Sequence, residues 1–240
     1  GASKEIATVC HSLPRGITIA AVDASDGTAN QVDYFRRVAG RPVLYFKREL
    51  PLGERWAIPF PLSFPACRVR ENRDRMMKIF YHATDHNGGS PGVPRREIVD
   101  NLLNQLPDAF LDVKLYPGQA KGTRPSPEEY HERMSRCMIG ISWNGAVNWD
   151  SNRFWENFAY GLCCVSETPR IEIPHPFIDG QHCFYANTPI GVARLAVELT
   201  QFPDAAMQVA HAGHQHWRKY HSSEARARYR IRDVDPFQSK

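Results

Sequence analysis

Short apolar runs alternate along this chain with longer segments of helical periodicity. The runs have the length and composition of strands and lie at residues 17–22, 43–46, 78–81, 138–143, 162–165 and 182–185. Helical patterns lie between them, at residues 30–38, 94–106, 127–137, 152–160, 190–201 and 204–220. Strands that alternate with helices pair in parallel and need helices on both faces. The pattern therefore predicts a doubly wound α/β sheet of the Rossmann-like type.

A proline-rich segment divides this pattern. Residues 50–65 contain four prolines, and proline suppresses both helix and central strand. We interpret the segment as a link or covering loop. It separates a small N-terminal part, residues 1–72, from a main α/β unit, residues 73–240.

The segment after the fourth apolar run carries the strongest signal for ligand binding. A polar loop follows the run and leads into a short helix, which Ser151 or Asn152 can cap. The free amides and the positive dipole end of such a helix favour an anion, above all phosphate. Arg153 adds a bidentate donor for phosphate oxygens, and Glu156 is an acceptor for two sugar hydroxyls. These two side chains indicate a ligand with a diphosphate and a ribose, and a solvated ion pair on a surface helix is the alternative.

The same segment resembles the C-terminal, donor-binding domain of the GT-B glycosyltransferases, in the broad group 1 set that includes spore-maturation-type transferases. The likeness extends over residues 75–225 and is carried by Arg153-Phe-Trp-Glu156-Asn-Phe-Ala-Tyr-Gly161, which matches R-x-x-E-x-x-A-x-G. The resemblance implies that Glu156 binds the ribose of a nucleotide-sugar donor and that the preceding loop, with Asn144 and Gly145, faces the diphosphate. It also implies glycosyl transfer to a glycan or other acceptor, without a cofactor or an obligatory divalent metal.

One position departs from the pattern of that family. Many retaining members carry a second glutamate eight residues before the ribose-binding one, and here that position is Asn148, with Asp150 nearby. The retaining mechanism cannot be inherited, so the catalytic residue stays unassigned. An inverting enzyme would need a carboxylate or histidine base near the acceptor.

The loop after the third apolar run is a second candidate for the donor site. The first strand–helix loop of a doubly wound fold lies where such folds contact their ligands. This loop contains Asp85 and His86, and Arg95 or Arg96 begins the next helix. We expect Asp85 or His86 to contact the diphosphate or the sugar, and an ordinary surface loop is the alternative.

Two other activities compete with glycosyl transfer. Asp23 and Asp26 follow the first apolar run, but their spacing of three differs from the spacing of two in GT-A metal sites and dehalogenase-type phosphatases. An Asx-type turn that ends at Gly27 is the favoured interpretation, and a phosphate-ligand enzyme that acts through Asp23 is the rival. A non-catalytic scaffold or glycan-binding module with the transferase fold is the other alternative.

Charge gives little support to nucleic-acid binding. The formal net charge of +4 is mild, and the basic residues are scattered. The densest basic group is Arg226, Arg228, Arg230 and Arg232. We interpret this group as a solvated C-terminal tail, with an anionic surface or RNA as the alternative ligand.

The cysteines indicate a reducing, cytoplasmic compartment. None of the six belongs to a C-x-x-C pair, so neither a disulfide framework nor a zinc site is predicted. Cys163 and Cys164 fall in an apolar run and should point to opposite faces of a strand, as small core residues. The histidines near the C-terminus lack a carboxylate or cysteine that would complete a metal site. No apolar run has membrane-spanning length, and we expect no signal peptide.

The first part of the chain is short for the family that the sequence resembles. The chain opens with Gly1-Ala-Ser and lacks an initiator methionine, which indicates a start that is not native. GT-B transferases place a full acceptor domain before the donor domain, and residues 1–72 are too few to build one. We therefore expect a missing domain or a partner subunit to complete the acceptor site.

Overall fold

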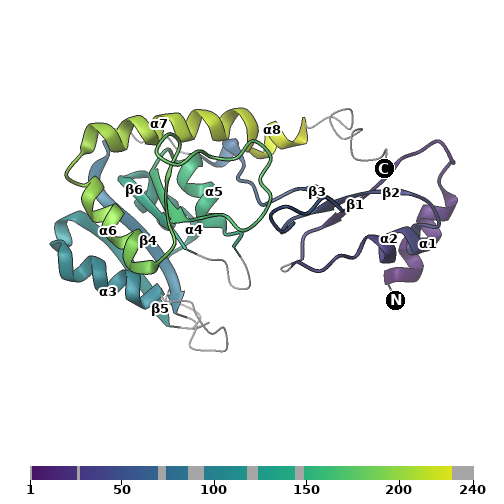
Figure 1. The fold of residues 1–240 in the computed structure, drawn as a ribbon, viewed down its shortest axis with the longest axis horizontal. Helices are drawn as coiled ribbons and strands as arrows, with labels where there is room; N and C mark the ends of the chain where they lie inside the picture. The colour runs from purple at the N-terminus through teal and green to yellow at the C-terminus, as the bar shows by residue number, and fades with distance from the viewer. Residues whose placement is uncertain are drawn as a thin grey trace.

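The computed structural model describes residues 2–25, 28–69, 74–85, 95–117, 124–143 and 149–228. These residues form a smaller and a larger lobe, which lie side by side along the longest axis of the molecule (Figure 1). We call residues 2–59 the N-terminal lobe, residues 60–69 the link and residues 74–228 the C-terminal lobe.

The N-terminal lobe is a three-stranded parallel sheet in the order β1-β2-β3, accompanied by two helices. Its elements are α1 (Ala2–Ser12), β1 (Ile19–Asp23), α2 (Val32–Ala39), β2 (Val43–Lys47) and β3 (Ile58–Pro59). Cys10 of α1, Ala39 of α2 and Val43 of β2 meet in a small apolar core. The proline-rich segment supplies β3, an edge strand, where the missing amide of Pro59 costs no hydrogen bond of a central ladder.

The C-terminal lobe is a five-stranded parallel sheet in the order β5-β4-β6-β7-β8. Its strands are β4 (Met76–Asp85), β5 (Leu111–Pro117), β6 (Cys137–Ser142), β7 (Cys163–Glu167) and β8 (Phe184–Ala186). Its helices are α3 (Arg95–Gln105), α4 (Pro127–Ser135), α5 (Asn152–Ala159), α6 (Pro189–Leu199), α7 (Pro203–Tyr220) and α8 (Ser223–Ala227). Short 3-10 turns lie at Ala66–Arg68 and Asp108–Phe110.

The order of the strands creates a switch point. The chain runs from β4 to β5 on one side and then returns to place β6 on the other side of β4. Loops that leave neighbouring strands in opposite directions open a crevice at the carboxyl ends of those strands, here β4 and β6. The predicted doubly wound Rossmann-like fold is confirmed.

Two apolar clusters sandwich the larger sheet. The first contains residues of α3 and α6, and the second contains residues of α4 and α5. Helix α7 contributes to both, through Val209 in the first and Trp217 in the second. Cys163 and Cys164 lie in different clusters, so the predicted alternation of these two side chains is confirmed. Burial raises the pKa of the Cys163 thiol to about 12, which makes it an inert core group.

Four of the described α-helices and strands are not predicted by the sequence patterns, namely α1, β3, β5 and α8. Strand β5 alternates apolar and polar residues, and Leu111, Val113 and Leu115 pack on the first cluster. That alternation is the ordinary signal of a half-buried strand, but the strands expected from the sequence are apolar runs, and charged Asp112 and Lys114 interrupt this one. Helix α1 begins at Ala2, within the Gly1-Ala-Ser opening whose sequence indicates a start that is not native.

Two glycines have distinct roles around α5: one allows the helix to pack closely on the sheet, and the other ends the helix. A Cβ atom at Gly140 of β6 would lie 2.3 Å from Oδ1 of Asn157, so only glycine allows the helix to approach the strand this closely. Gly161 ends the helix with a left-handed φ of +64°. The guanidinium of Arg75 donates to the carbonyls of Tyr160 and Gly161 and so satisfies acceptors that the helix end leaves free.

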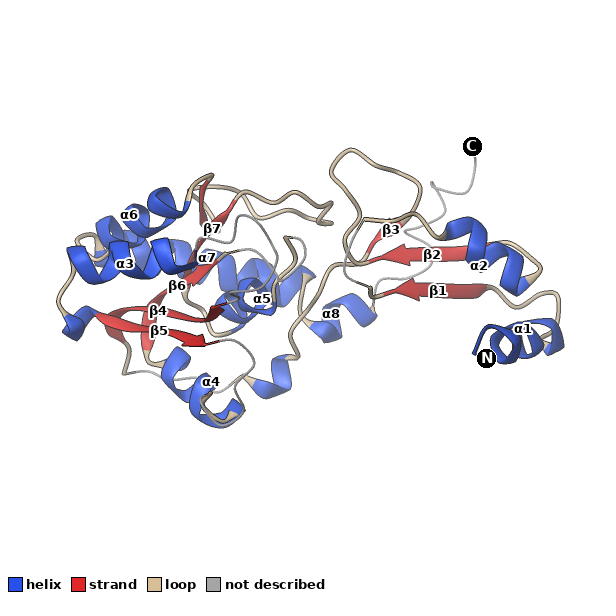
Figure 2. Ribbon diagram, turned by 90° about the horizontal axis from the view of Figure 1, so that it is seen from below, coloured by secondary structure: helices blue, strands red, loops and turns tan. Residues whose placement is uncertain are grey.

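The two lobes are joined by contacts besides the link. The amide of Leu52 donates to the carbonyl of Arg170 at 3.2 Å, and the amide of Glu172 donates to the carbonyl of Leu50 at 2.8 Å. The arrowheads of β1 and β2 point toward the larger lobe, and those of β4 and β5 point toward the smaller one (Figure 2). The carboxyl edges of the two sheets therefore face each other.

The predicted solvated C-terminal tail is wrong for Arg226. This residue follows the start of α8, is 4% exposed and donates to the carbonyls of Pro61 and Leu62 in the link. Its guanidinium lies 4.4 Å from the centroid of the Trp155 ring. Arg228 is exposed, and Arg230 and Arg232 lie outside the described residues. In the described part of the chain, no helix combines the length and the apolar character needed to cross a membrane.

Candidate functional site

Arg153 lies at the switch point of the larger sheet. Its Nη1 donates to the carbonyl of His82 in β4 at 3.5 Å, and its Nη2 donates to the carbonyl of Trp143, directly after β6, at 3.3 Å. Both distances are at the long end for N–H···O bonds. The Nε atom is buried and has no hydrogen-bond partner among the described residues. The guanidinium therefore keeps donor capacity at the carboxyl ends of the two central strands.

Two further hydrogen-bond donors near the same strand ends have no hydrogen-bond partner among the described residues. They are the hydroxyl of Tyr81 and the indole N–H of Trp143, both buried. The guanidinium of Arg153 lies 5.9 Å from the centroid of the Tyr81 ring. Burial raises the pKa of Tyr81 above its ordinary value, so the hydroxyl keeps its proton and remains a donor. Buried donors that the protein leaves unpaired are costly unless a ligand satisfies them.

Arg95 brings a second guanidinium to this edge of the sheet. It occupies the first position of α3, is 4% exposed, and its Nη1 donates to the carbonyl of Thr84 at 2.9 Å. The two arginines thus begin the two helices that follow β4 and β6, the strands on either side of the switch point. Positive charge and helix N-termini at one crevice favour an anionic ligand.

Glu156 faces helix α4. Its Oε2 accepts a hydrogen bond from the Tyr130 hydroxyl at 3.2 Å, and its Oε1 lies 3.8 Å from Nε2 of His131. The Glu156 side chain is 13% exposed. No ion pair joins Arg153 to Glu156, although both are described, so the alternative of a solvated surface pair is wrong. The two side chains instead contact different partners.

Sequence reasoning did not single out Tyr130 and His131. Both lie on α4, which was predicted as a helix, but no motif links them to the segment that carries Glu156. Only the packing of α4 and α5 on one face of the sheet brings them near Glu156.

A buried polar network lies beside Tyr130 and fixes the strands that carry the site. Nε2 of His82 lies 2.8 Å from Oδ1 of Asp112, and Nδ1 of His82 lies 2.9 Å from the hydroxyl of Tyr116. Nη2 of Arg133 donates to Oδ1 of Asp112 at 2.7 Å. Burial alone would raise the pKa of Asp112, but the bonds from His82 and Arg133 outweigh it and hold that pKa at about 2. This network ties β4, β5 and α4 together.

The predicted cap of α5 is wrong. Ser151 occupies the N-cap position, but its hydroxyl makes no capping hydrogen bond, and Asn152 is the first helical residue and is exposed. Ser151 is 6% exposed and follows Asp150, whose buried carboxylate is bound elsewhere. The amides of the first turn are therefore left without a side-chain cap, which suits a helix end that receives a ligand.

The structure does not describe the side-chain positions of four predicted donor-site residues. Asn144, Gly145 and His86 lie outside the described residues. Asp85 ends β4 at the carboxyl edge of the sheet, and its side chain is also not described. Their assignment to the donor site stays a prediction.

Asp23 has a structural role in the N-terminal lobe. Its Oδ1 accepts from the amide of Ser25 at 3.0 Å, which is the predicted Asx-type contact, and Gly27 lies outside the described residues. Its Oδ2 accepts from the Tyr45 hydroxyl at 2.6 Å and from Nζ of Lys47 at 3.0 Å. The carboxylate is 4% exposed and is engaged at both oxygens. This geometry disfavours Asp23 as a nucleophile.

The ring nitrogens of three C-terminal histidines lie within hydrogen-bonding distance of backbone carbonyls. Nδ1 of His214 lies 2.9 Å from the carbonyl of Phe158. Nε2 of His216 and Nε2 of His221 lie 2.8 and 2.9 Å from the carbonyl of His175. Among the described residues, no group of three or more histidine, cysteine or carboxylate side chains is arranged to hold a metal ion.

Known structures share this fold at low sequence identity. The chain superposes on a structure of accessory secretory proteins 1, 2 and 3 of Streptococcus pneumoniae with a TM-score of 0.58 and 9% identity, covering 97% of this chain and 50% of that chain. It superposes on an α-glucosyltransferase in complex with UDP-glucose and DNA containing an abasic site with a TM-score of 0.55 and 10% identity, covering 99% of this chain and 76% of that chain. The chain thus spans half the length of the first of these two structures.

The family comparison is more specific than the structural one. No curated protein sequence matches the chain significantly. The family model described as glycosyl transferase-like matches residues 95–232, which is more than half of the 240 residues and includes α3, α4 and α5 with Arg153 and Glu156. This chain belongs to the glycosyl transferase-like family and has a Rossmann-like fold of the GT-B type.

Proposed function

We propose that this chain binds a nucleotide-activated sugar at the carboxyl ends of β4 and β6 and transfers the sugar to an acceptor. The observation that carries the proposal is the position of Arg153, which bridges the ends of both strands and keeps a buried, unpaired Nε. Glu156 lies on the same helix, within the part of the chain that matches the family. An anion-binding group and a hydroxyl acceptor on one short helix suit a nucleoside diphosphate.

Each proposed donor-site residue has a distinct role. The amides at Ser151 and Asn152 and the Arg153 guanidinium stabilise the diphosphate as it leaves, and the Glu156 carboxylate binds the ribose hydroxyls. Asp85, His86, Asn144 and Gly145 belong to the two loops that border the crevice and contact the diphosphate or sugar. Arg153 and Arg95 supply positive charge, so the reaction proceeds without a divalent metal or a cofactor.

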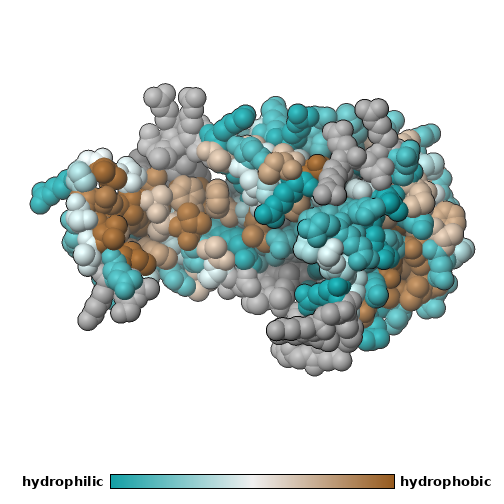
Figure 3. Space-filling model, turned by 180° about the vertical axis from the view of Figure 1, so that it is seen from behind, coloured by the Kyte–Doolittle hydropathy of each residue, from teal (hydrophilic) through white to brown (hydrophobic). Residues whose placement is uncertain are grey.

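The acceptor is proposed to bind between the two lobes. The carboxyl edges of both sheets face this region (Figure 2). The smaller sheet has three described strands, which is few for a complete acceptor domain, and we propose that a further domain, a partner subunit or self-association completes it. Apolar side chains gather on the outer end of the N-terminal lobe (Figure 3), where Ile6 and Val9 of α1 are 47% and 59% exposed. Exposed apolar groups of this kind support a role in association.

A panel of nucleoside diphosphates tests the proposal. A ligand that binds only the folded state raises the unfolding temperature, so the proposal expects at least one nucleoside diphosphate to do so. Arg153→Ala and Glu156→Ala should reduce the shift. Arg194→Ala and Glu198→Ala are matched controls, because both residues are exposed on α6. No shift with any nucleoside diphosphate at millimolar concentration would overturn the proposal.

A non-catalytic module is the second candidate function. The observation that favours it is Asn148, which stands where retaining members of the resembled family carry a glutamate. A similar structure contains accessory secretory proteins crystallised together, which is compatible with a role in an assembly. Nucleotide binding without any hydrolysis or transfer of a donor sugar, by the chain together with its partner, would favour the module over the enzyme.

A further inference from the structure

A buried carboxylate connects the donor helix to the link between the lobes. Oδ2 of Asp150 accepts a hydrogen bond from the amide of Leu62 at 2.7 Å, and Oδ1 accepts one from Nε1 of Trp155 at 2.8 Å. The Asp150 side chain is fully buried. Since Leu62 belongs to the link and Trp155 to α5, this single carboxylate joins two segments that lie far apart in the sequence.

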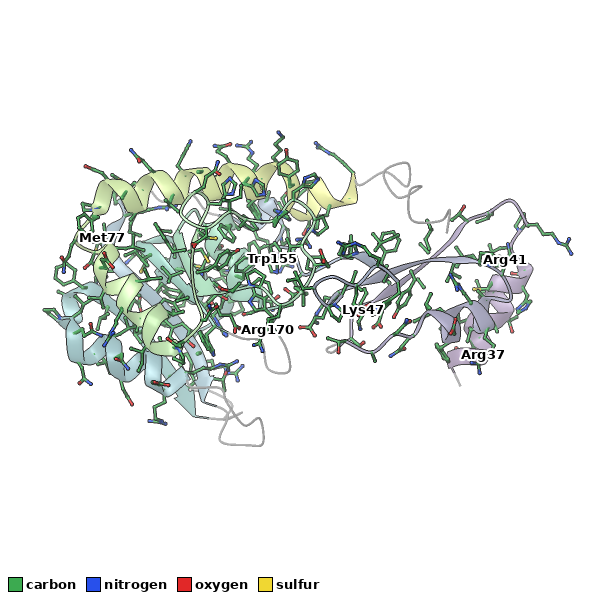
Figure 4. All side chains as sticks on the ribbon, in the orientation of Figure 1. Arg37, Arg41, Lys47, Met77, Trp155 and Arg170 are labelled. Carbon is green, nitrogen blue, oxygen red and sulfur yellow. The ribbon has the colours of Figure 1, made fainter. Side chains whose placement is uncertain are left out.

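The same residue also contacts the N-terminal lobe. The amide of Asp150 donates to Oε1 of Glu49 at 3.2 Å, and Nε of Arg48 lies 3.6 Å from Oδ2 of Asp150. Arg48 and Glu49 directly follow β2, the central strand of the smaller sheet. Arg226 completes the junction, because it donates to two carbonyls of the link and packs on the Trp155 ring. Figure 4 shows Trp155 in the larger lobe and Lys47, at the end of β2, in the smaller lobe across this junction.

The position of Asp150 in the sequence gives these contacts their importance. Asp150 directly precedes Ser151, the N-cap residue of α5. It lies three residues before Arg153, which belongs to the first turn of that helix. A shift of the smaller lobe moves Arg48 and Glu49, and both contact the residue that leads into that turn. Conversely, a ligand that moves the first turn of α5 changes the geometry of Asp150.

We propose that Asp150 is a positioning residue that couples the orientation of the N-terminal lobe to the first turn of α5. The inference rests on the proposed donor site, and it adds a regulatory link between donor binding and the arrangement of the lobes. Coupling of this kind is reciprocal, so a fixed lobe orientation should also strengthen donor binding. Asp150 contacts neither donor nor acceptor in this scheme and is not a catalytic residue.

Protonation offers an independent probe of the junction. Burial raises the pKa of Asp150 to about 6, against the opposing effects of the bonds from Leu62 and Trp155 and of the Arg48 and Arg226 charges. Glu49 is the other carboxylate at the junction. His221 faces Arg226, and burial lowers the pKa of His221 to about 2, so this histidine stays neutral through the range where Asp150 titrates. Neutralising Asp150 removes the acceptor charge that holds Arg48 and the link.

Asp150→Asn tests the proposal by keeping the shape of the side chain while removing its charge. The matched control is Glu172→Gln, because the Glu172 carboxylate also joins the lobes, through Arg55 and the amide of Gly53, but does not contact α5. The affinity for UDP is measured by calorimetry, and the radius of gyration is measured by X-ray scattering with and without UDP. We expect Asp150→Asn to weaken UDP binding at least about fivefold and to abolish any change of the radius of gyration on binding, with Glu172→Gln like wild type.

Two further measurements keep the outcomes distinct. If Asp150→Asn does not fold, Trp155→Phe removes one hydrogen bond of the junction without removing the charge and should weaken UDP binding in the same direction. If wild type binds another nucleoside diphosphate but not UDP, that nucleotide replaces UDP. If wild type binds no nucleoside diphosphate, the donor site is overturned, and the coupling is then decided by the pH dependence of the ¹⁵N-indole resonance of Trp155 and of the radius of gyration. Both should change together near pH 6 in wild type and not in Asp150→Asn. A folded Asp150→Asn protein with the affinity and pH profile of wild type would overturn the coupling.

Discussion

The hydroxyl of Tyr130 donates to Oε2 of Glu156 at 3.2 Å, across the interface between α4 and α5. Burial, and then the neighbouring Glu156 carboxylate, raise the pKa of Tyr130 well above its ordinary value, so the phenol stays protonated and can only donate in this pair. The bond holds the carboxylate in one orientation and leaves lone pairs of both oxygens for further donors. Preorganised acceptors of this kind bind ribose hydroxyls at a small entropic cost.

Removal of the Glu156 carboxylate should weaken nucleoside diphosphate binding. Glu156→Ala deletes charge-assisted hydrogen bonds to the ribose, and we expect a loss of about 1.5–3 kcal/mol in binding free energy with the fold intact. Tyr130→Phe should weaken binding in the same direction by a smaller amount, because the carboxylate remains but is no longer held. Calorimetry on both variants and on Glu198→Ala checks this. Equal affinity of wild type and Glu156→Ala, or global unfolding of the variant, would rule out the assignment.

Nucleotide binding should depend on Arg153 and not on a divalent ion. Arg153→Ala removes positive charge at the start of α5 and should reduce the affinity for nucleoside diphosphates, whereas EDTA should leave wild-type affinity unchanged. Calorimetry with and without EDTA measures both effects, and Arg194→Ala is the control for loss of a surface arginine. A strict requirement for manganese or magnesium would contradict the prediction.

Arg226 should contribute far more to stability than its neighbour Arg228. Arg226→Ala leaves two link carbonyls without their donor and removes packing from the Trp155 ring, so we expect the free energy of unfolding to fall by about 2–4 kcal/mol. Arg228→Ala alters an exposed side chain and should change it by less than about 0.5 kcal/mol. Urea unfolding of both variants gives the comparison, and similar values for the two would refute it.

Asp23 should make the N-terminal lobe sensitive to acid. Burial alone would raise the pKa of Asp23, but hydrogen bonds from Ser25, Tyr45 and Lys47 outweigh burial and hold that pKa at about 2. Because this is below the ordinary value of 3.8, the ionised carboxylate stabilises the fold above about pH 4. That stability is lost as the pH falls toward 2.

Asp23→Asn tests this pH dependence. The difference in unfolding free energy between wild type and variant should be about 2 kcal/mol at neutral pH and should shrink between pH 4 and pH 2. The control is Asp33→Asn, since the Asp33 side chain is 86% exposed. A difference that stays constant down to pH 2 would show that the Asp23 charge is not responsible.

Glycosyl transfer by this chain alone should be poor. Its smaller sheet has three described strands, and a cleft between two complete domains is needed to bring donor and acceptor together. We expect the monomeric chain to bind a donor nucleotide and to transfer little or no sugar. Donor turnover by the chain and by a longer parent or partner complex, with the mass in solution measured in parallel, checks this. Robust transfer by a 240-residue monomer would refute it.

Much of the larger lobe could be predicted from local patterns. The apolar run that became β6, the loop after it and the helix with Arg153 and Glu156 are contiguous, so their order and types follow from short-range periodicity. Cys163 and Cys164 point to opposite faces of the sheet, as the period-two geometry of a strand requires. Strand β5 is the exception, because Asp112 and Lys114 alternate with its apolar residues and it lacks the continuous apolar run expected of a strand.

The sequence by itself determined the fold class, the family resemblance and the helix that carries the candidate donor site, because each depends on residues within a few turns of one another. Tertiary structure alone decided which distant groups meet. It paired Tyr130 with Glu156, buried Arg226 against the link, and placed Asp150 between Leu62 and Trp155. Such contacts join segments tens of residues apart, and their geometry is set by how helices pack on a shared sheet, which no local pattern of polar and apolar residues encodes.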